Sequence, residues 1–216
     1  MKKTCFALLI VLIFSLMGET VSSQNTNIAL PLPQTTGGMP LMEALAKRHS
    51  AREFSEKELD MQSLSNLLWA AFGINRENEG RRTAPSAMNM QEIDIYVFLP
   101  QAVYIYNAKE NSLDFHIAGD FRKETGKQGF VKDAPINLVF VADYERMGNR
   151  DEDSRNWYAG VDAGYISQNV YLYCASENLN TVVRASLDKD ALKSAIKLRP
   201  SQHIVFAQTV GYPIDK

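Results

Sequence analysis

The chain has 216 residues, of which 45% are hydrophobic and 22% are charged. This composition is ordinary for a folded globular protein and argues against intrinsic disorder. The formal net charge of −2 at pH 7 gives no electrostatic reason to expect a nucleic-acid partner. At this length we expect one domain with room for an additional arm.

The first 23 residues have the pattern of a secretory signal peptide. Lys2 and Lys3 make a basic start, an apolar run follows from Cys5 to about Met17, and small residues precede a cleavage point before Gln24. The apolar run is short for a membrane span, so a retained anchor is the weaker alternative. We therefore expect an exported protein, periplasmic or secreted, with no stable membrane anchor after cleavage.

The number of cysteines limits which disulfides the mature chain can form. After removal of the signal peptide only Cys174 remains, so the monomer cannot form an internal disulfide. Cys174 lies in an apolar run with helical spacing, which predicts a small buried core residue and not a nucleophile.

Residues 24–40 are expected to form an extended arm, because Pro31, Pro33, Gly37 and Gly38 disfavour a regular helix. The domain then runs over residues 41–216. Its elements are predicted from hydrophobic periodicity and turn residues. Helices are expected at 41–47, 64–72, 157–177 and 188–196, a short polar helix at 120–128, and strands at 93–99, 102–106, 112–116, 136–142 and 203–210, with 179–185 left as a loop or short strand.

Four segments of this pattern carry further information. The start of the second helix is left open between a Ser55–Glu58 capping box, Asp60 and Ser63. The helix at 157–177 has apolar residues on several faces, which predicts burial in a large core or in a subunit interface. The stretch at 136–142 is a near-continuous apolar run, as in a buried central strand. Charged residues at 145–156 are expected to form a loop.

A basic cluster follows the first helix. Arg48, His49, Ser50 and Arg52 place two guanidinium groups around a hydroxyl, and planar N–H donors of this kind match the oxygens of a phosphate monoester. A solvated basic turn at a helix end is the alternative, since cations also suit the helix dipole there.

Small and amide residues gather at 83–91 without any structural period. Such a stretch allows a flat ligand to approach closely, and its amides can donate to ring carbonyls. A plain connecting loop is the alternative. Arg76, Arg81 and Arg82 precede it and could meet an anionic substrate, although solvated loop charges explain them equally simply.

Several kinds of catalytic site have no motif in this sequence. There is no CxxC, HExxH, P-loop or GxSxG pattern. His49, His116 and His203 are far apart in the chain and lack neighbours at metal-ligand spacing, so no metal site is expected. If the chain is an enzyme, a bound cofactor is expected to supply the chemistry.

Three ordered stretches resemble the nitroreductase family of FMN-dependent oxidoreductases. They are Arg48-His49-Ser50-Ala51-Arg52; residues 67–73 with 82–87, which look most like the branch containing the SagB-type dehydrogenases; and residues 169–172 with 182–186 and the closing 209–213. The resemblance implies an α+β fold with a central, mainly antiparallel sheet surrounded by helices. It also implies a homodimer with FMN at the subunit interface.

The resemblance further implies which residues bind the cofactor. Arg48, Ser50 and Arg52 would hold the FMN phosphate and ribityl chain beside His49. The remaining cofactor residues implied in this way are Pro85, Ser86, Ala87, Asn89 and Gln91 along the flavin ring, Val183 and Arg184 from a later segment, and Gly211 near the phosphate end.

This sequence departs from the family pattern at three places. Met88 stands where many relatives have glycine, Lys216 is only a possible substitute for a later basic phosphate ligand, and residues 178–180 replace a glycine-rich turn. No catalytic acid or base is assigned, because the family needs none.

The expected activity is ping-pong hydride or electron transfer from a reduced nicotinamide, or another donor, to a small acceptor such as a nitro compound or quinone. Export favours a donor other than NAD(P)H. The alternatives are a SagB-like flavin-dependent dehydrogenase or oxidase acting on an exported substrate, and a flavin-binding or partner-binding protein without turnover.

Overall fold

The computed structural model describes residues 26–214. The predicted signal peptide, its cleavage point before Gln24, and Lys216 lie outside the described residues. Residues 26–40 run without a helix, as expected for the arm, and contribute one short edge strand to the main sheet.

A seven-stranded sheet with the order β1-β6-β5-β4-β7-β9-β8 forms the centre of the fold, and every neighbouring pair is antiparallel. The predicted antiparallel sheet is therefore confirmed. Its strands are β1 (Ile28–Ala29), β4 (Ile93–Phe98), β5 (Ala102–Asn107), β6 (Ser112–Ala118), β7 (Ile136–Asp143), β8 (Asn180–Arg184) and β9 (Gln202–Gly211).

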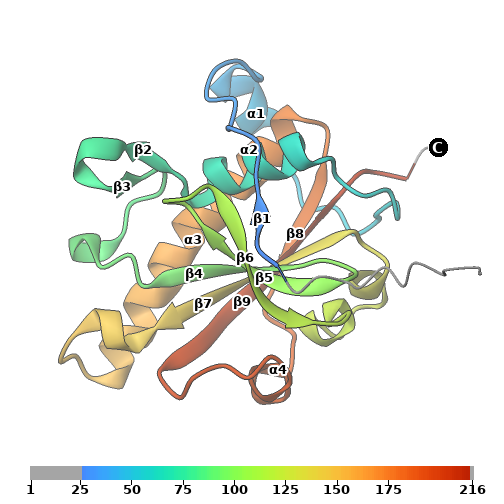
Figure 1. Ribbon diagram of the computed structural model, residues 1–216. Helices are drawn as coiled ribbons and strands as arrows, with labels where there is room; N and C mark the ends of the chain where they lie inside the picture. The colour runs from blue at the N-terminus through green and yellow to red at the C-terminus, as the bar shows by residue number, and fades with distance from the viewer. Residues whose placement is uncertain (1–25, 215–216) are drawn as a thin grey trace, which may run out of the picture.

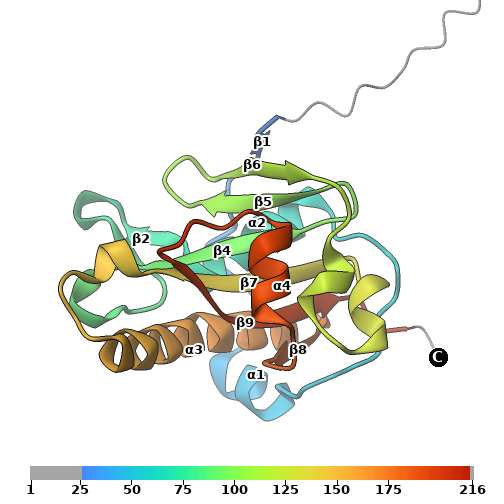
Figure 2. The ribbon, with the colours of Figure 1, turned by 90° about the horizontal axis from the view of Figure 1, so that it is seen from below.

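Helices cover both faces of this sheet. The long helix α3 (Glu152–Ser176) and the helix α2 (Met61–Phe72) lie on one face, and α1 (Leu41–Lys47) packs beside α3 (Figures 1 and 2). The short helix α4 (Lys189–Ala195) lies on the opposite face together with two 3₁₀ turns at Arg122–Thr125 and Gly129–Lys132 (Figure 2).

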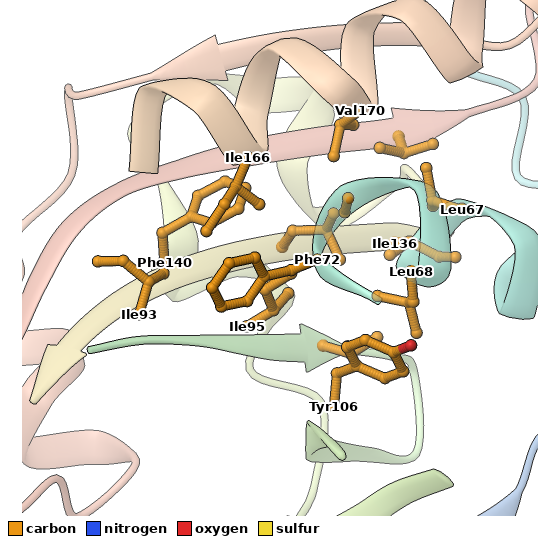
Figure 3. Packing of buried hydrophobic residues seen from close by; sticks show 14 of the residues in the cluster. Leu67, Leu68, Phe72, Ile93, Ile95, Tyr106, Ile136, Phe140, Ile166 and Val170 are labelled. Atoms are coloured by element: carbon orange, nitrogen blue, oxygen red, sulfur yellow. The ribbon is translucent and has the colours of Figure 1, made fainter. Parts of the chain in front are cut away.

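The sheet is buried on both sides because successive side chains of a strand point to opposite faces. On β7, Leu138 and Phe140 join the core under α2 and α3, whereas Val139 and Val141 join the core under α4. Figure 3 shows the larger core, where Ile166 of α3 packs above Phe140. The continuous apolar run at 136–142 is thus the central strand that the sequence predicts.

Capping side chains set the starts of the two larger helices. Asp60 caps α2 by accepting a hydrogen bond from the Ser63 N–H, so Asp60 is the correct choice among the three predicted starts. Asp151 caps α3 by the same contact with Ser154. The prediction of a charged loop over 145–156 is therefore wrong in part, because α3 begins at Glu152 and its acidic first turn suits the helix dipole.

Three segments have a secondary structure that the sequence did not predict or left open. The polar segment after Gly73 forms a small hairpin of β2 (Ile74–Arg76) and β3 (Arg81–Arg82). The polar helix predicted at 120–128 is only the short 3₁₀ turn Arg122–Thr125. The segment at 179–185, left open between loop and strand, is the edge strand β8.

Two further properties follow from the described part of the chain. None of its helices is long and apolar enough to cross a bilayer. Cys174 is buried in α3, as predicted, and burial raises the pKa of its thiol well above the ordinary value. This thiol is therefore held in its unreactive protonated form.

Candidate functional site

The basic cluster begins where α1 ends. The helix stops at Arg48, whose backbone leaves helical geometry while its N–H still bonds to the Ala44 carbonyl. The chain then runs alongside the edge strand β8, and the Ala51 N–H donates to the Thr181 carbonyl at 3.0 Å. The cluster is thus attached to the sheet by its backbone, which leaves its side chains free for other partners.

Tyr171 of α3 holds the centre of this cluster together. Its hydroxyl shares a hydrogen bond with the Ser50 hydroxyl at 2.9 Å. It also accepts a hydrogen bond from the Val183 N–H at 3.0 Å. The Arg48 guanidinium lies over the same ring, 5.3 Å from its centroid, within the range of a cation–π contact. One buried tyrosine therefore fixes the end of α1, the edge strand and the long helix relative to one another.

The two arginines of the cluster keep their charges unpaired. Within residues 26–214, neither Arg48 nor Arg52 has a carboxylate oxygen within 4.0 Å. His49 is exposed, and its Nδ1 contacts the Lys47 carbonyl at 2.9 Å. Two unpaired guanidiniums around an oriented hydroxyl form a donor set suited to a dianionic phosphate.

The last strand ends beside this cluster. Residues of both segments line a cavity of about 400 Å³ that includes His49, Arg52 and Pro213. Gly211 is packed so tightly that an added Cβ would lie 2.8 Å from the Cδ of Pro135. Gly211 lies at the end of the last strand, in the same part of the fold as the basic cluster. Its close packing against Pro135 explains why this position has no side chain.

The side chains of Val183 and Arg184 lie in different surroundings. They are successive residues of β8, so their side chains point to opposite faces of the sheet. Val183 is exposed beside Tyr171, whereas the Arg184 side chain is 5% exposed and bonds Thr125, Asn137 and Thr209. The Arg184 side chain is therefore held by internal partners, and an approach of this residue to the cofactor stays a prediction. Burial lowers its pKa to about 10.

The second predicted group of site residues lies further along α3. The Ala87 N–H donates to Asp162 at 2.8 Å, and Asp162 precedes Tyr171 by nine residues, or about 14 Å of helix. Pro85 and Asn89 are exposed, and the Ser86 hydroxyl accepts from the Gln91 N–H at 3.0 Å. The structure therefore places the 85–91 loop and the basic cluster at separate positions along one helix.

Gln91 supports the 85–91 loop with its side-chain amide. Its Oε1 accepts from Arg82 at 2.7 Å, and its Nε2 donates to the carbonyl of Gly80 and to Asn89. Both polar atoms of the Gln91 amide therefore have partners within the protein, and a contact of this amide with the flavin ring stays a prediction. Arg82 also donates to the Phe72 carbonyl, and burial lowers its pKa, so it is not a solvated loop charge.

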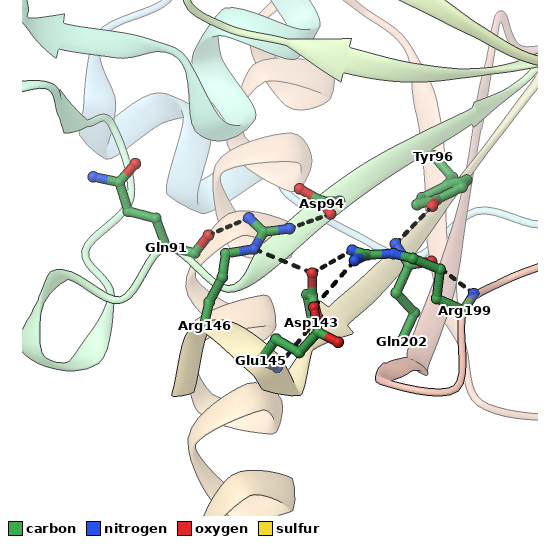
Figure 4. Close-up of polar contacts among 8 residues, drawn as sticks. All are labelled: Gln91, Asp94, Tyr96, Asp143, Glu145, Arg146, Arg199 and Gln202. Atoms are coloured by element: carbon green, nitrogen blue, oxygen red, sulfur yellow. Dashed lines mark hydrogen bonds and ion pairs between the residues drawn. The ribbon is translucent and has the colours of Figure 1, made fainter. Parts of the chain in front are cut away.

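A charged network holds the end of this loop. Arg146 donates to the Gln91 carbonyl and pairs with Asp94 and Asp143 (Figure 4). Burial acts to raise the pKa of Asp143, but hydrogen bonds from the Glu145 N–H, Ser201 and Arg199 outweigh it, so the pKa is lowered. This network keeps Asp143 ionised and ties β4 to β7 next to the loop.

Sequence reasoning missed Tyr171 as a site residue. Its helix is predicted, but an aromatic residue within an apolar helical run is ordinarily part of the core. Two signals were available: the stretch 169–172 carries part of the family resemblance, and a buried tyrosine hydroxyl usually needs a hydrogen-bond partner.

Comparisons with known proteins agree with this architecture. Residues 45–212 match the Nitroreductase family. A protein of Methanocaldococcus jannaschii, provisionally named a nitroreductase, is 30% identical over 209 residues, which cover 92% of this chain and all of that protein.

Two solved structures extend the comparison. A provisionally named nitroreductase of Ralstonia eutropha is 41% identical with a TM-score of 0.85, over 88% of this chain and 91% of that chain. The structure of the E. coli microcin synthetase McbBCD complex with truncated pro-MccB17 has a TM-score of 0.70 at 17% identity, over 98% of this chain and 85% of that chain. That second likeness shows the fold alone.

The chain belongs to the nitroreductase family, because the match covers most of its length and extends to a relative at 30% identity. Members of this family typically bind FMN. The unpaired Arg48 and Arg52 and the oriented Ser50 hydroxyl fit the phosphate of such a cofactor.

Proposed function

We propose that this chain is an FMN-dependent oxidoreductase that passes electrons from a reduced nicotinamide, or another donor, to a small organic acceptor such as a nitro compound or quinone. Family membership supports an oxidoreductase. The observation that carries the proposal is the pair of guanidiniums without a carboxylate partner in residues 26–214, Arg48 and Arg52, on either side of the Ser50 hydroxyl that Tyr171 orients.

Each part of the site has a physical task in this proposal. FMN, when bound, supplies the hydride and electron transfer chemistry. Arg48, Arg52 and Ser50 bind its phosphate, and Tyr171 keeps Ser50 and Arg48 oriented before the cofactor arrives. The small side chains of Ser86 and Ala87 leave room for a flat ring system. No side-chain acid or base is assigned.

We also propose that the active form is a homodimer. On α1, the apolar side chains of Leu41, Met42 and Leu45 are 62%, 75% and 44% exposed, and on the neighbouring α3 Trp157 and Tyr165 are 63% and 49% exposed. An apolar surface of this kind on adjacent helices is typical of a subunit interface. Sedimentation equilibrium should give twice the monomer mass, and a stable monomer that retains FMN would contradict this part.

The direct test is an absorbance spectrum of the purified protein followed by anaerobic addition of NADH and then NADPH. A yellow protein that bleaches with either nucleotide supports the reductase. A colourless protein that takes up no added FMN contradicts the proposal and favours a partner-binding protein.

A mutational test addresses the phosphate site itself. Arg48→Ala should weaken FMN binding by about 1–3 kcal/mol, the scale of a lost charge-assisted hydrogen bond. Lys109→Ala is a matched control, because Lys109 is an exposed cation on the turn between β5 and β6. Equal FMN affinity of the two variants would remove Arg48 from the site.

Export remains part of the proposal and changes the expected donor. The pattern of residues 1–23 supports a signal peptide, and an exported enzyme would have little access to NAD(P)H. A SagB-like dehydrogenase or oxidase acting on an exported substrate is then the second candidate, which the resemblance at residues 67–73 and 82–87 supports. A yellow protein inert to both nucleotides would favour it, and N-terminal sequencing of the protein from its native cells tests export.

A further inference from the structure

Glu92 is a buried carboxyl group that accepts no hydrogen bond from the described residues. It follows the 85–91 loop directly, its side chain is fully buried, and neither carboxyl oxygen has a hydrogen-bond partner among the described residues. Its backbone carbonyl accepts from the Asp143 N–H at 2.9 Å, which fixes the backbone at this position. A buried carboxylate with no hydrogen bonds is strongly disfavoured, so such a group is expected to hold a proton.

Asp162 of α3, which is 2% exposed, is an acidic neighbour of Glu92. One of its oxygens, Oδ2, accepts the hydrogen bond from the Ala87 N–H. Burial raises the pKa of Glu92 to about 7, and the neighbouring Asp162 acts in the same direction, whereas Arg146 opposes it. Two carboxyl groups that share a buried site are not both charged at low cost, and a shared proton removes the repulsion.

The loop beside this pair needs such support. Met88, Asn89 and Gln91 have φ angles of 51°, 55° and 48°, in the left-handed region that side chains other than asparagine rarely adopt. A backbone of this kind persists only when its surroundings hold it. The Ala87 N–H bond to Asp162 is one of those constraints, and it depends on Asp162 staying in place.

We propose that Glu92 carries a proton and that its O–H donates a hydrogen bond to Asp162, so that the two carboxyl groups position Ala87 and hold the 85–91 loop in its binding conformation. The link to ligand binding rests on the proposed function, in which this loop faces the cofactor. Loss of the proton at higher pH places a second negative charge beside Asp162. The loop is then released, and FMN binds more weakly.

Two measurements test the carboxyl pair, and one of them needs no cofactor. Infrared difference spectra of the cofactor-free protein should show a protonated carboxylic acid that disappears as pH rises through about 7 and that is missing in Glu92→Gln. FMN affinity of the wild type should fall about tenfold between about pH 6 and about pH 8, the effect of a shift of one pKa unit on binding. Glu92→Gln keeps a donor that cannot ionise, so its affinity should stay flat.

Control variants separate this proposal from general loss of structure. Glu110→Gln removes an exposed carboxylate and should leave the wild-type pH profile unchanged. In Asp162→Asn the amide can donate to Glu92, so the infrared midpoint should move below that of the wild type. This variant serves if Glu92→Gln does not fold.

The outcomes distinguish the two proposals. Absence of a protonated carboxylic acid above about pH 6, or the same pH profile in Glu92→Gln and the wild type, would overturn the role of the pair. If the protein takes up no FMN at any pH, the proposed function fails, and the infrared result still decides whether Glu92 shares its proton with Asp162.

Discussion

Replacement of Tyr171 by phenylalanine tests whether one hydroxyl organises the phosphate site. The change keeps the ring under Arg48 and removes the oxygen that contacts Ser50 and the Val183 N–H. Each lost hydrogen bond should reduce the free energy of unfolding by about 1 kcal/mol. The expected total for the two hydrogen bonds is therefore about 1–2 kcal/mol.

The expected effect on FMN binding is smaller but specific. Without Tyr171 the Ser50 hydroxyl loses its fixed orientation, and the binding free energy should weaken by about 0.5–1.5 kcal/mol, or roughly two- to twelvefold in affinity. Urea unfolding of the cofactor-free protein gives the stability change, and quenching of FMN fluorescence gives the affinity.

Tyr173→Phe is the matched control. The Tyr173 hydroxyl lies on the same helix and donates to the Ser63 carbonyl of α2 at 3.2 Å, with no contact to the basic cluster. It should cost similar stability and leave FMN affinity unchanged. If Tyr171→Phe loses stability but binds FMN as tightly as the Tyr173 variant, the reasoning about Ser50 is refuted.

Three further predictions concern stability and reactivity. Relative to Glu92→Gln, the wild type should lose about 3 kcal/mol of unfolding free energy as pH rises from about 4.5 to about 7, because the folded state holds the Glu92 proton more tightly than the unfolded chain. Chemical denaturation of both proteins across this pH range measures the difference in stability. A difference that stays constant with pH would contradict the raised pKa of Glu92. Gly211→Ala should destabilise by about 1–3 kcal/mol through the contact of its Cβ with Pro135, visible as a lower melting temperature. The Cys174 thiol should react with Ellman's reagent only after unfolding, and rapid labelling of the native protein would show that α3 opens.

Local sequence patterns predicted most elements because each depends on neighbouring residues. The helix at 41–47 and the central strand at 136–142 follow from periodicity and appear as α1 and β7. The start of α3 was missed because a charged first turn resembles a loop in composition, whereas Asp151 and Ser154 make it a cap. Periodicity carries no information on such a polar first turn.

The candidate site was predictable only in part. The basic cluster could be recognised because its residues are consecutive and their chemistry is explicit. Arg184 and Gln91 were assigned to the site by resemblance, and both side chains turn out to have internal partners. Strand alternation separates Arg184 from Val183, but the sequence left open whether this segment was a strand.

The sequence by itself determined the chemical groups available, namely two arginines around a serine, and the order of helices and strands that carries them. Only the tertiary structure decided which distant groups meet them. Ser50 and Tyr171 are 121 residues apart in the chain, and Glu92 meets Asp162 only because α3 crosses the sheet beside the 85–91 loop. Contacts of this kind depend on how the layers pack, which no local pattern of residues specifies.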